Sequence, residues 1–251
     1  MANISAANTG NTAGTPLQGG VALVTGGSRG IGKAIASRLA ALGAAVSICG
    51  RDKEKLIFAA RELEAAGAKV FALRADVTKE PDIHAFVTAT EKQFGGITIL
   101  VNNAGTGGGG FGAIHEKTES EWDQVMNTNL KSVFFVSRAV IPGMIQRRGG
   151  DIVNISSLAG KNTFAGGGIY CASKWGLQGL SGCMAEDLRA HGIRVSVICP
   201  GSVATDFMGR SAKDPGKVLT ADDVAHAVGM VATQGRQSFI SEVHLRPVAK
   251  P

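Results

Sequence analysis

Short apolar runs alternate with longer amphipathic segments along most of the chain. Seven runs rich in β-branched residues predict strands at residues 21–25, 45–49, 69–74, 97–102, 152–156, 194–198 and 239–245. The intervening segments show helical periodicity over residues 30–42, 52–66, 79–94, 119–147, 170–190 and 220–233. The first six strands are almost continuously apolar, which is typical of strands buried on both faces of a sheet.

This alternation predicts an α/β fold, a single-domain Rossmann-type doubly wound parallel sheet with helices on both faces. Asp52 and Thr220 occupy expected N-cap positions, and Gly43 and Gly67 follow predicted helix ends. No repeat or proline-rich linker divides the chain, so residues 20–251 are expected to form one domain. Residues 1–19 are small and polar, and we expect a disordered leader there.

Composition narrows the functional classes. Hydrophobic residues make up 44% and charged residues 18% of the chain, which excludes a disordered polyelectrolyte. The net charge is +6, but the basic residues are dispersed, so no nucleic-acid partner is expected. No apolar run is long enough to cross a membrane.

Cysteine and histidine usage points to a cytoplasmic protein without a metal. The four cysteines form no Cys-x-x-Cys pair and are expected to be reduced thiols. The five histidines are too scattered along the sequence for a metal-binding motif, so no metal site is predicted. The amino-terminal segment lacks the apolar run of a secretory signal and the arginines of a transit peptide.

A glycine-rich turn follows the first predicted strand. Gly26 allows a tight turn, Gly30 a close backbone approach, and Gly32 close packing of the helix on the strand. The amides at the start of that helix favour a pyrophosphate. The predicted contacts in this stretch are Gly26, Ser28, Arg29, Gly30, Ile31 and Gly32. The alternative is an ordinary glycine-rich turn between a strand and a helix.

The end of the second strand favours NADP(H) over NAD(H). Gly50 stands where NAD-binding folds place an acid for the ribose hydroxyl, and Arg51 follows it. A guanidinium suits a 2′-phosphate, and Arg29 adds a second positive charge. The alternative for Arg51 is a surface arginine at a helix start.

Two further strand ends complete the predicted nucleotide site. Asp76 and Val77 follow the third strand, where an aspartate can accept a hydrogen bond from an adenine amino group, or simply stabilise a turn. Asn103, Ala104 and Gly105 end the fourth strand, where small residues allow a cofactor to lie against the sheet. Asparagine side chains there can also tie neighbouring strands together.

Three residues predict acid–base chemistry on a carbonyl or hydroxyl group. Tyr170 is the only tyrosine, and Lys174, four residues later on a predicted helix, shares its face. A nearby ammonium is expected to lower the phenol pKa. Ser157, at the end of the fifth strand, is placed to hydrogen-bond a carbonyl oxygen. The alternatives are a surface helical pair and a strand-end cap.

Together these motifs resemble the short-chain dehydrogenase/reductase family, strongly over residues 20–206. The matching stretches are 25–32, 76, 102–105, 127–130, 157, 170–174 and 200–201. The resemblance implies that Tyr170 is the general acid or base and that Lys174 binds the ribose and lowers the tyrosine pKa. It implies that Ser157 positions the carbonyl and that Asn129 shapes its helix and holds a water.

The resemblance also extends the cofactor site. Asn103 is implied to line the nicotinamide half of the site. Val203 and Thr205, which follow Pro200 and Gly201, are implied to meet the nicotinamide carboxamide and a phosphate. Hydride would pass between the nicotinamide and a carbonyl carbon.

Within the family the chain is most similar to 3-oxoacyl-(acyl-carrier-protein) reductases, which implies fatty acid biosynthesis. Arg147, Arg148 and Lys131 are candidates to meet an acidic carrier protein. The chain lacks their usual glycine pair after the last strand, and its segment between Pro200 and Thr220 is short. The side chains expected to form the wall of the substrate pocket are Phe111, Leu158, Phe164, Phe207 and Met208.

Three functions remain open at this point. The first is NADPH-dependent reduction of a ketone or 3-oxoacyl thioester. The second is an NAD(P)-dependent dehydrogenase of a small alcohol, sugar or steroid, and the third is a nicotinamide-binding regulator without turnover. The family resemblance also implies a homodimer or homotetramer, assembled through the helices predicted at 119–147 and 170–190.

Overall fold

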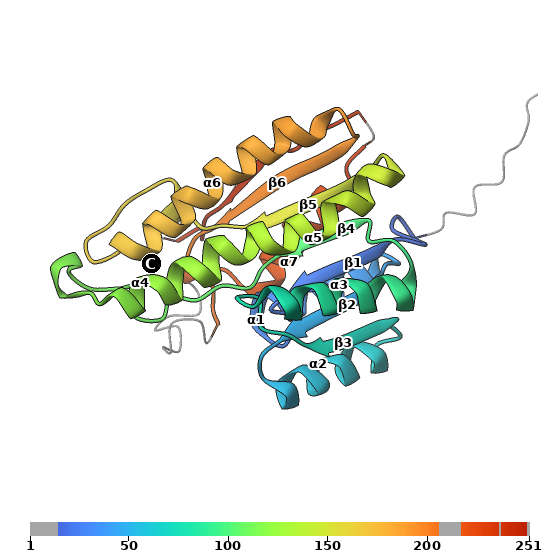
Figure 1. Cartoon of the computed structure of the whole chain (residues 1–251), viewed down its shortest axis with the longest axis horizontal. Coiled ribbons are helices and arrows are strands. Elements are labelled where there is room, and N and C mark those ends of the chain that lie inside the picture. The colour runs from blue at the N-terminus through green and yellow to red at the C-terminus, as the bar shows by residue number, and fades with distance from the viewer. Residues whose placement is uncertain (1–14, 206–216, 236, 250–251) are drawn as a thin grey trace, which may run out of the picture.

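The computed structural model describes residues 15–205, 217–235 and 237–249 of the chain. Its seven strands form one parallel sheet with the order β3-β2-β1-β4-β5-β6-β7 (Figure 1). The strands are β1 (Val21–Thr25), β2 (Ala45–Gly50), β3 (Val70–Arg74), β4 (Ile99–Asn102), β5 (Gly150–Ile155), β6 (Ile193–Pro200) and β7 (Glu242–Leu245). The predicted doubly wound fold is confirmed.

The described residues form seven α-helices, which flank the two faces of this sheet. They are α1 (Gly30–Ala41), α2 (Lys53–Ala65), α3 (Glu80–Phe94), α4 (Glu119–Met126), α5 (Ser132–Arg147), α6 (Gly168–Arg189) and α7 (Ala221–Ala232). Residues of α1, α2 and α7 build one hydrophobic core, and residues of α3, α5 and α6 build the other. Figure 1 shows α5 continuing from the end of α4, with α6 running alongside on the same face.

The continuous apolar strands are explained by these two cores. In β1, Ala22 and Val24 pack into the core under α1, whereas Val21 and Leu23 pack into the core under α3 and α5. Every residue of such a strand is buried, so the sequence shows a solid apolar run instead of an alternating pattern.

The predicted helix ends are also present. The Asp52 side chain accepts a hydrogen bond from the Lys55 amide, and Thr220 and Asp223 form a capping box. Gly43 and Gly67 adopt positive φ angles of 103° and 86° just after their helices, which glycine does without steric cost.

The segment predicted as one helix over 119–147 is instead two helices joined by a π-helical turn, Asn127–Lys131. The Asn129 side chain within this turn bonds to the loop after β4. Buried apolar residues such as Val125 and Val133 occur on both sides of the turn, so the pattern predicted one continuous helix. Such π turns are frequent at functional sites.

Buried asparagines tie the centre of the sheet together, as predicted. The Asn102 amide donates to Asn154 Oδ1 at 2.9 Å, which links β4 to β5. The Asn154 amide donates to Ser181 Oγ on α6 at 2.8 Å. These bonds fix α6, and with it Tyr170 and Lys174, against the strand ends.

Residues at the amino end of the described chain contact the end of α1. Residues 15–19, which the sequence assigned to the leader, form a turn in which the Leu17 amide donates to the Leu42 carbonyl at 2.8 Å. The rest of the predicted leader lies outside the described residues.

Within the described ranges, no helix combines the length and apolar character required to span a bilayer.

Candidate active site

A cavity of about 1320 Å³ opens where the strands end at their carboxyl edge. It is larger than most small-ligand pockets. Every residue predicted to bind the cofactor lines it, namely Gly26, Ser28, Arg29, Gly30, Ile31, Gly32, Arg51, Asp76, Val77, Asn103, Ala104, Gly105, Tyr170, Lys174, Pro200, Gly201, Val203 and Thr205. The structure thus brings residues from the whole length of the chain to one site.

The turn between β1 and α1 can hold only glycines at its key positions. Gly26 has a φ of +68°, and a Cβ on Gly32 would lie 2.2 Å from the Gly26 carbonyl oxygen. No side chain caps the first turn of α1, so its amides and its positive dipole end are directed to the cavity. This arrangement fits the pyrophosphate of a dinucleotide.

The far end of the cavity is positively charged. Arg29 and Arg51 line it together with Lys55, which was not predicted from the sequence to contact the cofactor. Lys55 follows Arg51 by one helical turn, a spacing that could have revealed it. Asp52 is committed to the start of α2, because its carboxylate accepts from the Lys55 amide and pairs with the Lys55 ammonium at 3.2 Å. This end therefore suits a phosphate better than a bare hydroxyl.

Asp76 also lines the cavity. Burial raises its pKa, but hydrogen bonds from Thr78 and the positive charges of Arg51 and Lys79 outweigh burial and lower the pKa below the usual value. The backbone amide and hydroxyl of Thr78 both donate to Asp76 Oδ1. Asp76 is therefore a fixed carboxylate acceptor at the cavity wall.

Asn103 supports the glycine turn as well as lining the cavity. Its amide donates to the carbonyl oxygens of Thr25 at 2.9 Å and Gly26 at 3.3 Å. The Thr25 hydroxyl in turn accepts from the backbone amides of Asn103 and Ala104. These bonds fix β4 beside the turn, so Asn103 acts on a bound cofactor largely through the shape of the backbone.

Ser157, Tyr170 and Lys174 meet at the middle of the cavity. Ser157 follows β5, and its side chain is hydrogen-bonded to Tyr170. Lys174 is buried, and its ammonium donates to the Ile155 carbonyl oxygen at 3.0 Å. The ammonium lies 5.9 Å from the centre of the Tyr170 ring. The three residues predicted from their spacing are therefore brought together.

The electrostatics of this trio differ from the sequence expectation. Burial raises the pKa of Tyr170 to about 12, and the hydrogen bond with Ser157 offsets only part of that rise. Burial lowers the pKa of Lys174 to about 8. Burial therefore outweighs any lowering of the Tyr170 pKa by the lysine, because a phenolate and an ammonium both lose their hydration there.

Asn129 does not line the cavity, unlike the other predicted catalytic residues. Its Oδ1 accepts from the Thr106 amide at 2.8 Å, and its amide donates to the Thr106 carbonyl oxygen and to Ser173 Oγ. The Ser173 hydroxyl donates to the Tyr170 carbonyl oxygen at 2.7 Å. Asn129 is thus a positioning residue that ties the loop after β4 to the helix that carries Tyr170.

Aromatic rings form the wall beyond Tyr170. The Phe111 ring centre lies 5.4 Å from that of Tyr170 and 6.2 Å from that of Phe164. Leu158 also lines this end, whereas Phe207 and Met208 lie outside the described residues. The wall offers an apolar surface next to the phenol.

The segment after β7 closes this end, which the sequence did not reveal. Residues 246–249 line the cavity. The Gly201 amide donates to the Leu245 carbonyl oxygen at 2.9 Å, which places Pro247 beside Gly201. Arg246 of this segment lines the cavity and is exposed to solvent. No local motif marks this contact, because it joins positions more than forty residues apart.

Two predicted carrier-protein contacts lie at the opposite edge of the sheet. The Arg147 guanidinium donates to the carbonyl oxygen of Ile97, just before β4 begins. Arg148 lies beside Gly192, just before β6 begins. A carrier docked over the cavity mouth would not reach these arginines, because the length of the strands separates the two edges.

Comparison with known proteins gives a consistent picture. Residues 20–216 match the family model described as short chain dehydrogenase. A 2-(S)-hydroxypropyl-CoM dehydrogenase of Xanthobacter autotrophicus is 38% identical over 84% of this chain and 89% of its own length. A putative ketoacyl reductase of the granaticin polyketide synthase of Streptomyces violaceoruber is 43% identical over 76% of this chain and 70% of its own.

A solved structure extends the likeness to three dimensions. The crystal structure of a metagenomic short-chain oxidoreductase in complex with NADP superimposes with a TM-score of 0.82 and 44% identity. The match covers 94% of this chain and all of that one.

Ionisation of Tyr170 can be measured directly, because it is the only tyrosine. We expect the ligand-free protein to show no tyrosinate absorbance at pH 10 and a midpoint near pH 12, whereas the unfolded chain titrates near about pH 10. Since the pKa of Tyr170 is higher in the folded than in the unfolded protein, the free energy of unfolding decreases as the pH rises from about 10 toward 12.

The Ser157→Ala variant tests the cause of the shift. Removing the hydrogen bond that lowers the Tyr170 pKa should move the midpoint further up. A wild-type midpoint at or below about pH 10 would show that burial does not control this phenol. Tyr170→Phe supplies the spectroscopic blank.

Proposed function

We propose that this chain, which belongs to the short chain dehydrogenase family, catalyses NADPH-dependent reduction of a ketone, and specifically of a 3-oxoacyl thioester. The observation that carries the proposal is a half-buried Tyr170 beside Ser157 and Lys174, between a glycine turn that suits phosphate and an apolar wall. The geometry supports binding of a dinucleotide at one end and a carbonyl compound at the other.

The acid–base step follows from the state of Tyr170. With its pKa near 12, the phenol is protonated at neutral pH, so it can donate a proton to a carbonyl oxygen that gains negative charge. Ser157, bonded to the phenol, holds the same oxygen through its hydroxyl. Bound NADPH supplies the hydride that the carbonyl carbon accepts.

Lys174 balances the charge that proton donation creates. Its pKa near 8 leaves the amine mostly protonated at neutral pH. A buried ammonium stabilises the phenolate that remains after donation. The bond from Lys174 to the Ile155 carbonyl keeps this charge within reach of the ring.

Preference for NADP(H) follows from the charged end of the cavity. Arg29, Arg51 and Lys55 line the region that faces the ribose of a nucleotide seated on the α1 turn. Gly50 leaves no acid to bind the ribose hydroxyls, and even a Cβ there would lie 3.1 Å from Ser28 Oγ. These residues fit a 2′-phosphate. The metagenomic relative, whose structure contains NADP, supports the same choice.

The substrate end supports a thioester with an apolar acyl chain. Phe111 and Phe164 offer an apolar surface beside Tyr170. Arg246 adds a positive charge to the cavity lining, which suits the phosphate of a carrier arm. The relative from Streptomyces, named a putative ketoacyl reductase, supports this class of substrate.

A second candidate is oxidation of a secondary alcohol by the same site. The relative from Xanthobacter autotrophicus is named a dehydrogenase and matches most of this chain. Tyr170 would then accept the alcohol proton instead of donating one. In that direction its high pKa is a disadvantage in the ligand-free site, because the phenolate is costly to form.

We also propose that the enzyme is a cytoplasmic homo-oligomer. Large apolar side chains remain exposed on neighbouring helices of one face, with Trp122 on α4, Phe134 on α5 and Trp175 on α6. The four cysteines are all free, and three of them are buried, which suits a reducing compartment.

Turnover should require Tyr170 and NADPH. We expect the wild type to oxidise NADPH in the presence of acetoacetyl-CoA and to work more slowly with NADH. Tyr170→Phe should lower kcat by about a hundredfold or more, since general acid catalysis contributes that much. The measurement is the loss of NADPH absorbance, with NADPH binding to the variant as the control.

A negative result in this assay would distinguish between the remaining candidate functions. Tight NADPH binding without turnover of acetoacetyl-CoA would exclude the thioester, and a panel of ketones and secondary alcohols would then test the second candidate. Absence of turnover on the whole panel would instead indicate a nicotinamide-binding regulator.

Cofactor preference should depend on Arg51. We expect Arg51→Ala to raise the KM for NADPH roughly tenfold or more, because a charge-assisted contact to phosphate is lost. The KM for NADH should change little. Arg61→Ala, an exposed arginine on α2 outside the cavity, is the matched control. Equal effects of Arg51→Ala on the two cofactors would contradict a role for Arg51 at the 2′-phosphate.

Assembly should depend on the exposed aromatic face. Light scattering should give a mass of two or four chains, and Phe134→Glu should shift the protein toward the monomer, since it places a charge on a surface that would be buried. A monomeric wild type would reject the proposed oligomer.

A further inference from the structure

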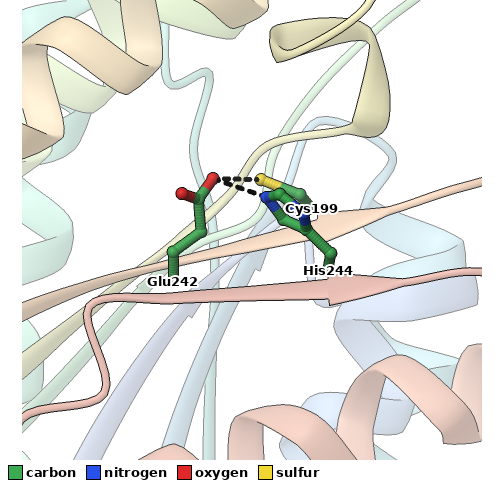
Figure 2. A group of neighbouring side chains, drawn as sticks. All are labelled: Cys199, Glu242 and His244. Carbon is green, nitrogen blue, oxygen red and sulfur yellow. Dashed lines mark hydrogen bonds and ion pairs between the residues drawn. The ribbon is translucent and has the colours of Figure 1, made fainter.

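A cluster of three potential metal ligands lies on the edge strands of the sheet. Cys199 of β6 and His244 of β7 are register partners, and Glu242 is two residues before His244 on the same face. Figure 2 shows the three side chains converging from the two strands. The sequence could not reveal this group, because Cys199 and Glu242 are 43 residues apart.

The distances match the spacing of ligands around a small divalent cation. Cys199 Sγ lies 3.3 Å and His244 Nε2 lies 3.0 Å from the same oxygen, Glu242 Oε1. All three ligand atoms lie within 4.8 Å of one another. Tetrahedral zinc, with Zn–S near 2.3 Å and Zn–N or Zn–O near 2.0–2.1 Å, places its ligands about 3.3–3.6 Å apart.

We propose that Cys199, Glu242 and His244 bind a divalent cation of the zinc class. A thiolate, an imidazole and a carboxylate are all ligands that Zn²⁺ accepts, and the thiolate and imidazole select against Mg²⁺ and Ca²⁺. Three protein ligands leave a fourth position open to water. The side chains of Glu242 and His244 are 30% and 42% exposed, so an ion can enter from solvent.

Neighbouring groups set the conditions for binding. The Lys161 ammonium lies 2.9 Å from Glu242 Oε1 and competes for the carboxylate that the cation needs. Lys161 is about one-third exposed, so it can move aside. The Gln178 amide nitrogen lies 3.0 Å from Cys199 Sγ and donates to it, which supports a thiolate.

Binding must displace the thiol proton of Cys199. Burial raises the pKa of this thiol to about 11, so at neutral pH one proton leaves for each cation bound. Affinity should therefore increase with pH. This competition limits affinity but does not alter the geometry of the ligands.

The cluster lies outside the cavity but not beyond its electrostatic reach, because the charge of Cys199 raises the pKa of Lys174 against the effect of burial. None of its three residues lines the cavity. It nevertheless borders the cavity, because Cys199 precedes Pro200 and His244 precedes Leu245 and the segment that closes the substrate end. A cation here would join β6 to β7 through side chains as well as through the backbone.

Titration of zinc chloride into chelator-treated protein, followed by calorimetry, tests the proposal. We expect one Zn²⁺ per chain, with release of protons that shows up as a dependence of the heat on the buffer. Cobalt(II) should give a thiolate charge-transfer band and tetrahedral d–d absorption. The whole protein is used, without any nicotinamide or substrate, so the result is independent of the proposed reaction.

Matched variants identify the ligands. Cys199→Ser and His244→Asn should each weaken binding at least tenfold, whereas Cys183→Ser and His115→Asn, which change an exposed cysteine and an exposed histidine elsewhere, should leave it unchanged. Lys161→Gln should tighten binding severalfold, because it frees Glu242. Circular dichroism melting confirms that each variant is folded.

Three results would overturn the proposal. The first is Zn²⁺ binding that survives both Cys199→Ser and His244→Asn. The second is binding that disappears with Cys183→Ser instead, and the third is a cobalt complex without a thiolate band. His244 is exposed, so His244→Asn remains informative even where the buried Cys199 variant is destabilised.

Discussion

Parallel pairing of all seven strands is the constraint on which the rest of the structure depends. Because every strand runs the same way, every loop that leaves a strand at its carboxyl end opens on one edge. Residues as far apart in sequence as Gly26 and Ala249 therefore line one cavity. Helices cover both faces of the sheet, so this edge is where the fold can bind a large ligand without disturbing its two cores.

Burial at this edge shifts the pKa values of Tyr170 and Lys174, and it makes the charged form of each group unfavourable. The shifts of the Tyr170 and Lys174 pKa values each correspond to roughly 3 kcal/mol in favour of the neutral form. Alone, neither charge is favourable in the site. A phenolate formed beside the Lys174 ammonium would regain part of this free energy, because opposite charges stabilise each other. Asn129 and Ser173 contribute indirectly, since their bonds fix the helix that carries both groups.

The sequence predicted the parts of the molecule that depend on local pattern. Strands such as β1, buried on both faces, appear as apolar runs, and in the turn after β1 Gly26 has a positive φ and a Cβ on Gly32 would collide with the Gly26 carbonyl oxygen. The π-helical turn was missed because buried apolar positions continue on both sides of it. The resemblance implied that Asn129 shapes its helix, but its partners Thr106 and Ser173 could not be predicted, because they are 23 and 44 residues away. Spacing placed Lys174 beside Tyr170, but it could not give the depth of burial that sets their pKa values.

The segment that closes the substrate end has a practical consequence for handling the protein. Ala249 lines the cavity, so a tag joined close to it would lie beside the cavity. The turn at residues 15–19 instead packs against Leu42 at the far end of α1, on the opposite edge of the sheet. Affinity tags, fluorophores and surface attachment therefore belong at the amino end, where the cavity stays turned toward the solution.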